Sequence, residues 1–384
     1  MSLAAFYDAL AYLLFVAGRY VEYLSATERT TTMARLLGDS RMVFSAEVQR
    51  GNALQMLGHV EDALRVTEGA LALCPESDDL VVLSGAYNGK AYIHLFRGEF
   101  DISMRYSQQA FDLVERVGDP VFVIFLDAAR NLLPIFLGEW TRVREAMGPS
   151  IAISRQLGES WASAYALTVL GKVSLVQGQW GEAAHILEEA INHAARIGDF
   201  QALRWAASAL AELAVQEGRP DAAKARLLPL LDRPGLEEFD VTGFLPVLAW
   251  AYLELGESIK AAETVAAAIR RARAGQLRLM LTDALRVQAL VAARQGRLTE
   301  AILALDEGLA LAEALPYPYA EGRLLQLYGT LYGTLPAEHA DAQGRLTAAL
   351  AIFRRLGAQK DLEWTEQLLT KLDRDVAPYA LTDG

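Results

Sequence analysis

Apolar residues along the chain recur every three or four positions, the spacing that places them on one face of an α-helix. Two stretches show this most clearly, at 160–177 and 179–196. Their apolar positions at this spacing are Ala164, Leu167, Leu170 and Leu175 in the first stretch, and Ile186, Leu187, Ala190 and Ile191 in the second. No window alternates apolar and polar residues as a half-buried strand would. The pattern predicts an all-α protein in which helices follow one another.

Glycines interrupt this pattern at an almost fixed interval. They stand at Gly18, Gly58, Gly98, Gly138, Gly178, Gly218, Gly256 and Gly296. The interval is 40 residues throughout, except for 38 between Gly218 and Gly256. Glycine tolerates the left-handed backbone that ends a helix, so each of these positions predicts a turn. Self-similarity at such a period indicates a stack of small units, each relying on its neighbours for a buried core.

Two further positions define the unit. Seven residues before the turn glycine stands a small residue in all but one case, namely Gly51, Ala91, Asn131, Gly171, Ala211, Ala249 and Ala289. A second set of glycines marks another turn, at Gly38, Gly118, Gly158, Gly198 and Gly357. An acidic residue often follows this second glycine, where it accepts hydrogen bonds from the first amides of a helix. Each period therefore holds two helices and two turns.

Asn131 is the exception in the small-residue series. A buried amide without partners costs about 1–3 kcal/mol, so this side chain needs a local acceptor or a ligand. We expect it to bond a carbonyl of its own helix.

These residues resemble the tetratricopeptide repeats, whose pattern is a small residue, a turn glycine seven later, an aromatic and then alanines. The long period of about 40 residues is similar to the C-terminal sensor regions of bacterial STAND-type signal-transduction ATPases and related transcription activators. The resemblance implies a right-handed α-α superhelix of about nine helix pairs. It spans nearly the whole chain, which we interpret as one solenoid domain over 1–384, with 359–384 as a capping helix and tail.

One region departs from the regular period. The interval shortens after Gly218, and Pro246 falls within the first helix of the next unit. Because proline lacks a backbone donor, it bends or interrupts a helix. We therefore expect a change of curvature between 234 and 246.

Composition narrows the possible partners and the location. The net charge is −12 and no basic cluster occurs on a helix, which argues against direct nucleic-acid binding. The single cysteine, Cys74, excludes an internal disulfide, and its neighbours suggest a packing role. Neither a membrane span nor a secretion signal is evident, so we expect a cytoplasmic protein.

No catalytic or cofactor motif has convincing spacing. The stretch 85–91 has too few residues between its glycines for a phosphate loop. His185, Glu189 and His193 share a helical stripe, but the two histidines would be about 12 Å apart at about 1.5 Å per residue. We predict no enzyme activity, no cofactor and no metal site.

The tetratricopeptide resemblance also implies where a ligand binds. In that family the first helix of each pair lines the concave groove, at positions six and three before and one, four and five after the small residue. Transferred to this chain, the rule gives the ligand- or partner-binding residues Asn88, Tyr92, Phe125, Tyr165, Thr168, Lys172, Trp205, Ser208, Glu212 and Trp250. Large rings at these positions also serve as ordinary packing residues, and that interpretation stays open.

The sequence therefore favours a non-catalytic module that recognises a protein, peptide or small effector in its groove, within a larger bacterial signalling or transcription-regulatory protein. The alternative is a self-contained scaffold that assembles other proteins or itself. Both are compatible with an apolar first helix containing Phe6 and Leu13, which upstream repeats or a homodimer would cover.

Overall fold

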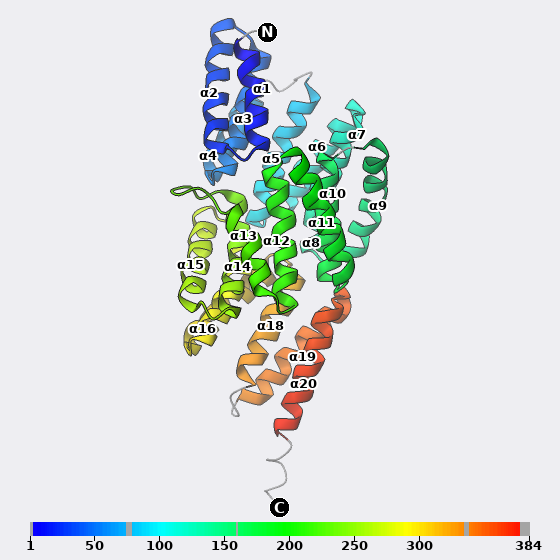
Figure 1. The fold of residues 1–384 in the computed structure, drawn as a ribbon, viewed down its shortest axis with the longest axis vertical. Helices are drawn as coiled ribbons and strands as arrows, with labels where there is room; N and C mark the ends of the chain where they lie inside the picture. The colour runs from blue at the N-terminus through cyan, green and yellow to red at the C-terminus, as the bar shows by residue number, and fades with distance from the viewer. Residues whose placement is uncertain (1–2, 74–78, 159, 334–337, 377–384) are drawn as a thin grey trace, which may run out of the picture.

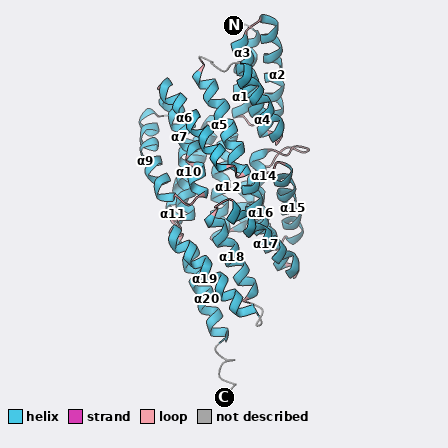
Figure 2. Cartoon of the chain, turned by 180° about the vertical axis from the view of Figure 1, so that it is seen from behind, coloured by secondary structure: helices cyan, strands magenta, loops and turns pink. Residues whose placement is uncertain are grey.

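The computed structural model describes residues 3–73, 79–158, 160–333 and 338–376. Within these ranges every regular element is a helix and no strand occurs (Figure 2). The predicted all-α class is confirmed. Cys74 and Glu159 lie outside the described residues.

The described helices form nine successive pairs followed by a last helix (Figure 1). The first helices of the pairs are α1 (Leu3–Val16), α3 (Ser40–Met56), α5 (Leu80–Arg97), α7 (Pro120–Arg130) with α8 (Leu132–Phe136), α10 (Trp161–Val176), α12 (Phe200–Gln216), α14 (Phe239–Glu254), α16 (Arg278–Arg294) and α18 (Pro318–Tyr332). The second helices are α2 (Tyr20–Leu37), α4 (Val60–Leu73), α6 (Phe100–Val117), α9 (Trp140–Leu157), α11 (Trp180–Ile197), α13 (Pro220–Leu227), α15 (Ser258–Ala274), α17 (Leu298–Ala314) and α19 (His339–Leu356). The last helix is α20 (Gln359–Val376).

The periodic glycines form the predicted turns. All eight have a left-handed φ, from +65° at Gly18 to +81° at Gly58. The small residue seven positions earlier is required by close helix packing, since a Cβ on Gly171 would lie 2.6 Å from Leu187. Acidic caps start several of the helices, as when Asp39 accepts from the Met42 amide at 3.0 Å and Asp199 from the Ala202 amide at 2.9 Å.

Asn131 behaves as expected from its position. Its amide nitrogen donates to the backbone oxygen of Asp127, at 2.8 Å. The side chain is buried, and its bond stays within the helical turn that joins α7 to α8. The prediction of a local carbonyl partner is confirmed.

The superhelix winds through more than one turn, and its second turn stacks against its first (Figure 1). The turn glycines of the first five pairs make these contacts. Their neighbours in the next superhelical turn are Phe200 at Gly18, Glu237 at Gly58, Leu315 at Gly98, Leu356 at Gly138 and Lys360 at Gly178. One large apolar core runs between the helix layers and joins residues from Val60 to Ala358. The inner surface is thereby partly covered, and residues on it such as Tyr92, Lys172 and Trp205 are half-buried.

The irregular region lies slightly earlier than predicted. A 3-10 turn (Leu228–Leu230) follows α13, and the backbone stays non-helical up to α14, with a left-handed Gly235. Of the two outcomes expected at Pro246, a bend or an interruption, the interruption does not occur, because α14 runs through Pro246 without a break. Proline removes one backbone hydrogen bond there, and packing against α12, α13, α15 and α16 holds the helix together.

Candidate functional site

The interior of the superhelix contains two cavities separated by a shared wall. The first, which we call the amide cavity, has a volume of about 180 Å³ and is lined by residues between Phe15 and Trp205. The second, the charged cavity, has a volume of about 190 Å³ and is lined by residues between Tyr92 and Arg323. Tyr92, Leu132 and Trp205 border both. The rings of Tyr92 and Trp205 stack with their centroids 5.3 Å apart.

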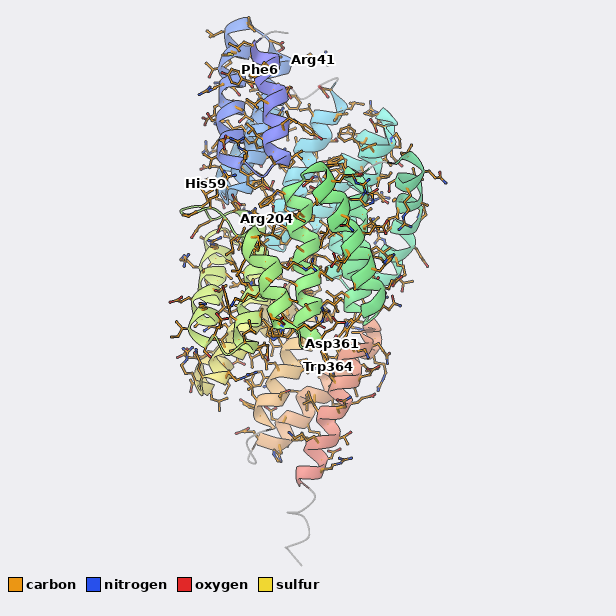
Figure 3. All side chains as sticks on the ribbon, viewed as in Figure 1. Phe6, Arg41, His59, Arg204, Asp361 and Trp364 are labelled. Carbon is orange, nitrogen blue, oxygen red and sulfur yellow. The ribbon has the colours of Figure 1, made fainter. Side chains whose placement is uncertain are left out.

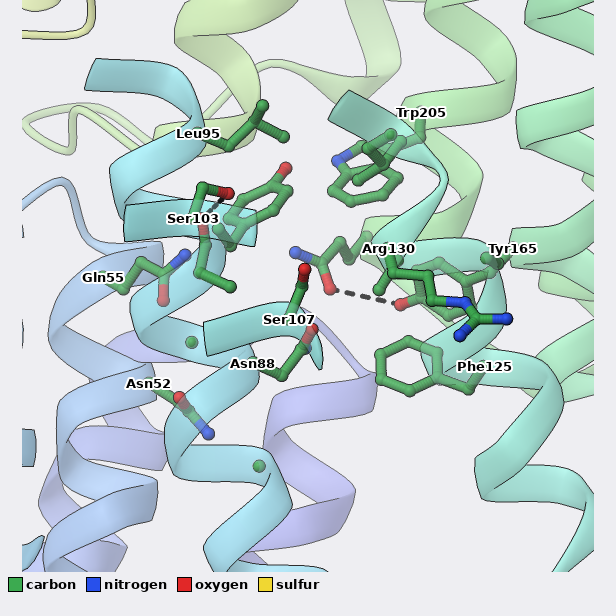
Figure 4. Close-up of a pocket in the computed structure, with 18 of the residues that line it drawn as sticks. Asn52, Gln55, Asn88, Leu95, Ser103, Ser107, Phe125, Arg130, Tyr165 and Trp205 are labelled. Carbon is green, nitrogen blue, oxygen red and sulfur yellow. Dashed lines mark hydrogen bonds between the residues drawn. The ribbon is translucent and has the colours of Figure 1, made fainter. Parts of the chain in front are cut away.

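One side of the amide cavity carries three side-chain amides, from Asn52 and Gln55 on α3 and from Asn88 on α5 (Figure 4). Gln55 is only 3% exposed. None of the three amide groups has a hydrogen-bond partner within the described residues. Because an amide both donates and accepts, this side of the cavity offers unused hydrogen-bonding capacity in a sheltered place.

The opposite side of the amide cavity is aromatic (Figure 4). Tyr165 packs edge-on against Phe125 at 5.0 Å and against Trp205 at 5.7 Å between ring centroids. The Tyr165 hydroxyl donates to Gln201 at 3.1 Å and lies 3.2 Å from Asp199, which fixes the ring. Burial raises the pKa of Tyr165, so this hydroxyl stays protonated. The amide cavity thus places neutral amides opposite aromatic rings, with one cation among the rings, Arg130, which is paired with Asp127 at 2.9 Å (Figure 4).

Ionisable side chains from five first helices line the charged cavity. Arg204 and Asp240 are described below, and the other five are Lys172 on α10, Glu212 on α12, Asp283 and Arg286 on α16, and Arg323 on α18. Only one pair among them is joined, where the Arg323 guanidinium donates to Glu212 at 2.6 Å. Burial alone would raise the pKa of Glu212, but Arg323 lowers it.

The remaining three charges have no direct counter-charge. Lys172, Asp283 and Arg286 make no hydrogen bond or ion pair with any described residue. Burial lowers the pKa of Lys172, and burial together with nearby Arg323 lowers the pKa of Arg286 to about 10. Burial, followed by the charge of Glu212, raises the pKa of Asp283 to about 6.

Beneath these charges lies an ion pair that is almost fully buried. Arg204 is 1% exposed, lies near the middle of the molecule (Figure 3) and lines the charged cavity. Its guanidinium contacts Glu238 at 2.5 Å and donates to the Leu230 backbone oxygen at 2.9 Å. Nearby, Asp240 accepts from the Trp205 indole at 3.0 Å.

The structure brings eight of the ten predicted binding residues to the cavity walls. Asn88, Tyr92, Phe125, Tyr165 and Trp205 line the amide cavity, and Tyr92, Trp205, Lys172, Ser208 and Glu212 line the charged cavity. Two do not line either. The Thr168 hydroxyl instead donates to the Ala164 carbonyl of its own helix at 2.7 Å, and Trp250 supports two arginines from behind.

Several wall residues were missed by the sequence argument. Asn52, Gln55, Asp283, Arg286 and Arg323 all line a cavity. Four of them lie at the same offsets from Gly51 or Ala289, and Arg323 lies six residues before Gly329, which follows Ala289 by 40 residues but has Pro336 in place of the turn glycine. The signal was present, but the rule was applied only to the units between Ala91 and Ala249.

Other candidate chemistry does not gather in the described part of the chain. No group of three or more histidine, cysteine or acidic side chains there is placed to hold a metal ion. Glu189, from the histidine stripe, is held by Arg155 at 2.8 Å. None of the described helices combines the length and apolar character needed to cross a bilayer.

Comparisons with known proteins agree with this architecture. The family model described as the MalT-like TPR region matches residues 37–320. A search of curated proteins gives no match. Among solved structures, a Rap protein complexed with Competence and Sporulation Factor has a TM-score of 0.58 at 13% identity, covering 98% of each chain. The Rap conjugation gene regulator of plasmid pLS20, in complex with the Phr* peptide, has a TM-score of 0.56 at 11% identity, covering 91% of this chain and 98% of that one.

The two structural likenesses show a shared helical-repeat fold. The family match covers well over half of the chain, and the expected tetratricopeptide resemblance is confirmed. This chain belongs to the family of MalT-like TPR regions.

Proposed function

We propose that this chain is a non-catalytic regulatory module that binds a short peptide inside its superhelix. The observation that carries the proposal is the row of unpaired amides from Asn52, Gln55 and Asn88 facing an aromatic wall. An extended peptide has backbone N–H and C=O groups that such amides can pair with. Its apolar side chains would find surface on the rings of Phe125 and Tyr165.

Two further observations support a peptide as the ligand. The pLS20 regulator, which shares the fold, was solved with the Phr* peptide. In this chain both cavities lie on the inner helices of consecutive repeats, which presents an elongated rather than a single-point site. We place the module in the cytoplasm, within a larger bacterial signalling or transcription-regulatory protein, without direct nucleic-acid contact because its net charge is −12.

The test is selection of peptides by the full chain from a synthetic library of random hexapeptides, read by mass spectrometry and followed by calorimetry. Asn88→Ala should weaken binding of the selected peptides about fivefold or more, because one hydrogen bond is worth about 1 kcal/mol. Trp205→Phe should also weaken binding, because the smaller ring leaves the shared wall incomplete.

Trp180→Phe is the matched control. Trp180 packs against Trp364 at 5.7 Å and lines neither cavity, so this change should leave affinity unaltered. Equal affinity of the parent chain and Asn88→Ala, with a parallel null result for Gln55→Ala, would remove the amide cavity as the peptide site.

A second candidate function is self-assembly through α1. Four large apolar side chains of this helix are exposed, including Phe6 at the N-terminal end of the molecule (Figure 3). They are Leu3 at 58%, Phe6 at 46%, Tyr12 at 57% and Leu13 at 63% exposure. A homodimer covering them would give twice the monomer mass by light scattering, and Leu13→Glu would return the chain to a monomer.

A further inference from the structure

The charged cavity contains two cations with no counter-charge in direct contact. The Lys172 ammonium and the Arg286 guanidinium make no hydrogen bond or ion pair with any described residue. Both side chains are half-buried, and this partial burial lowers the pKa of each. An unpaired charge in such a place is costly unless something neutralises it.

The indole ring of Trp250 contacts two arginines of the charged cavity, Arg286 and Arg323. The Arg286 guanidinium lies 4.8 Å from the centre of the indole ring, and that of Arg323 lies 5.5 Å from the same centre. Cation–π contacts hold both planar groups in place without using their N–H donors. The Arg323 guanidinium donates a hydrogen bond to Glu212. The Arg286 guanidinium makes no hydrogen bond with any described residue, so all of its N–H donors are available to another acceptor.

The acidic groups of the cavity do not satisfy these cations. Glu212 is joined to Arg323, and Asp240 is held by the Trp205 indole. Asp283 faces Lys172, Glu212, Arg286 and Arg323 without contacting any of them directly. The tyrosines Tyr317 and Tyr319 also border this space, and burial raises the pKa of each, so they stay neutral.

We propose that the charged cavity receives a carboxylate of the bound peptide between Lys172 and Arg286, and that Asp283 opposes this binding when it is ionised. The inference rests on the proposed function and deepens it, since it names the group that specifies the ligand. A peptide lying along the amide cavity has one end at the wall of Tyr92 and Trp205, directly beside the charged cavity. In this proposal that end is the carboxyl end of the peptide.

The proposal makes binding depend on pH with a definite sign. Asp283 has a pKa of about 6, so lowering the pH from 7.5 to 5.0 neutralises it and removes a like charge. The α-carboxyl group of a peptide ionises at about 3.5 and stays charged across this range. Affinity should therefore rise about fivefold to tenfold on acidification, as expected for a shift of up to about one pKa unit in Asp283 on binding.

The experiment uses the full chain and two matched pools of random hexapeptides, one with a free C-terminal carboxylate and one with a C-terminal amide. A third pool lacks Asp and Glu and separates terminal from side-chain carboxylates. Retention of each pool is compared at pH 7.5 and 5.0. The variants are Asp283→Asn, the double change Lys172→Met with Arg286→Met, and Asp240→Asn as a comparison acid.

The free-acid pool should be retained at least fivefold better than the amidated pool, and Asp283→Asn should bind at pH 7.5 as the parent binds at pH 5.0. Asp240→Asn should keep the pH response. The double variant should lose the preference for the free acid. If the retained peptides are only those that contain Asp or Glu, the cavity still binds a carboxylate, but one from a side chain rather than from the C-terminus. Equal retention of free-acid and amidated peptides would overturn the inference while leaving peptide binding intact.

A second measurement does not depend on peptides. Sodium succinate should raise the midpoint of thermal unfolding of the parent chain above that in sodium chloride of equal ionic strength, and the double variant should lose this difference. If no peptide pool is retained, peptide binding is refuted and this measurement alone decides the carboxylate site. Absence of any succinate effect in the parent chain would then refute the site as well.

Discussion

The two cavities occupy equivalent positions on the inner helices but are built differently. The amide cavity is lined by residues from Phe15 to Trp205, where α12 of the second superhelical turn meets α3 and α5 of the first. The charged cavity is lined by residues from Tyr92 to Arg323, and so lies between one superhelical turn and the next. Both cavities therefore depend on the stacking of the second superhelical turn on the first. The amide cavity meets the second turn only at α12, through Gln201 and Trp205, whereas the charged cavity takes residues from α12, α14, α16 and α18.

The difference in chemistry has an energetic consequence. A neutral amide that faces a small cavity without a protein partner costs little free energy, because water in the cavity or a ligand can form its hydrogen bonds. Half-buried charges without direct partners are more costly than neutral amides, so Lys172, Asp283 and Arg286 lower the stability of the fold that contains them. Such a cost is tolerated at sites that bind ligands, where the unpaired charge serves recognition.

The largest effect should come from the ion pair beneath the charged cavity. Arg204→Met leaves Glu238 buried without its counter-charge, and should lower the free energy of unfolding by about 3–5 kcal/mol. Urea denaturation at pH 7.5 measures this. Arg226→Met removes an exposed pair with Glu188 and should cost less than about 1 kcal/mol. Equal losses in the two variants would mean that burial does not distinguish the two pairs.

The next effect should come from the contact between superhelical turns. Gly98 and Gly218 share a left-handed φ, at +77° and +74°, so replacement by alanine strains both by about 1 kcal/mol. Only at Gly98 would the new Cβ meet another segment, since it would overlap Leu315, whereas nothing lies near Gly218. Gly98→Ala should therefore cost about 1–3 kcal/mol more than Gly218→Ala. Equal urea midpoints would contradict the stacking of the superhelical turns.

A smaller, pH-dependent effect should separate the two cavities. The raised pKa of Asp283, about 6 in the folded chain, means that its contribution to stability is present at low pH and is lost as the pH rises to about 6. Asp283→Asn removes this loss, so the variant should gain about 2 kcal/mol on the parent between pH 4.5 and 7.5. Asn88→Ala, in the amide cavity, should show the same difference from the parent at both pH values, because an amide does not titrate.

The sequence alone specified the repeat and part of the inner surface. The glycine period and the small residues gave the turns and the helix pairs, because both depend on local backbone and close packing. The family rule for groove positions predicted eight residues that line a cavity. It failed at Thr168, whose hydroxyl donates a hydrogen bond to a carbonyl of its own helix. That choice depends on a rotamer, which no sequence offset encodes.

Two features could not be predicted from the sequence. The stacking of superhelical turns joins Gly98 to Leu315, and its geometry accumulates from small rotations at every repeat interface, none of which leaves a local signal. The charged cavity follows from that stacking, because Arg323 meets Glu212 only when the turns stack. Asn52, Gln55, Asp283 and Arg286, by contrast, were within reach of the same rule, since each lies at one of its offsets from Gly51 or Ala289.

The smallest effect tests the wall of the amide cavity. Tyr165→Phe removes a hydroxyl that donates to Gln201 and contacts Asp199, and leaves the ring in place. Since neutral hydrogen bonds contribute about 1 kcal/mol, the variant should lose about that much free energy of unfolding by urea denaturation. Tyr106→Phe is the control, because the Tyr106 hydroxyl makes no hydrogen bond with any described residue. A loss above about 3 kcal/mol in Tyr165→Phe would mean that the hydrogen bonds around the amide cavity form a coupled buried network. The two cavities would then not differ in how strongly their buried polar groups depend on one another.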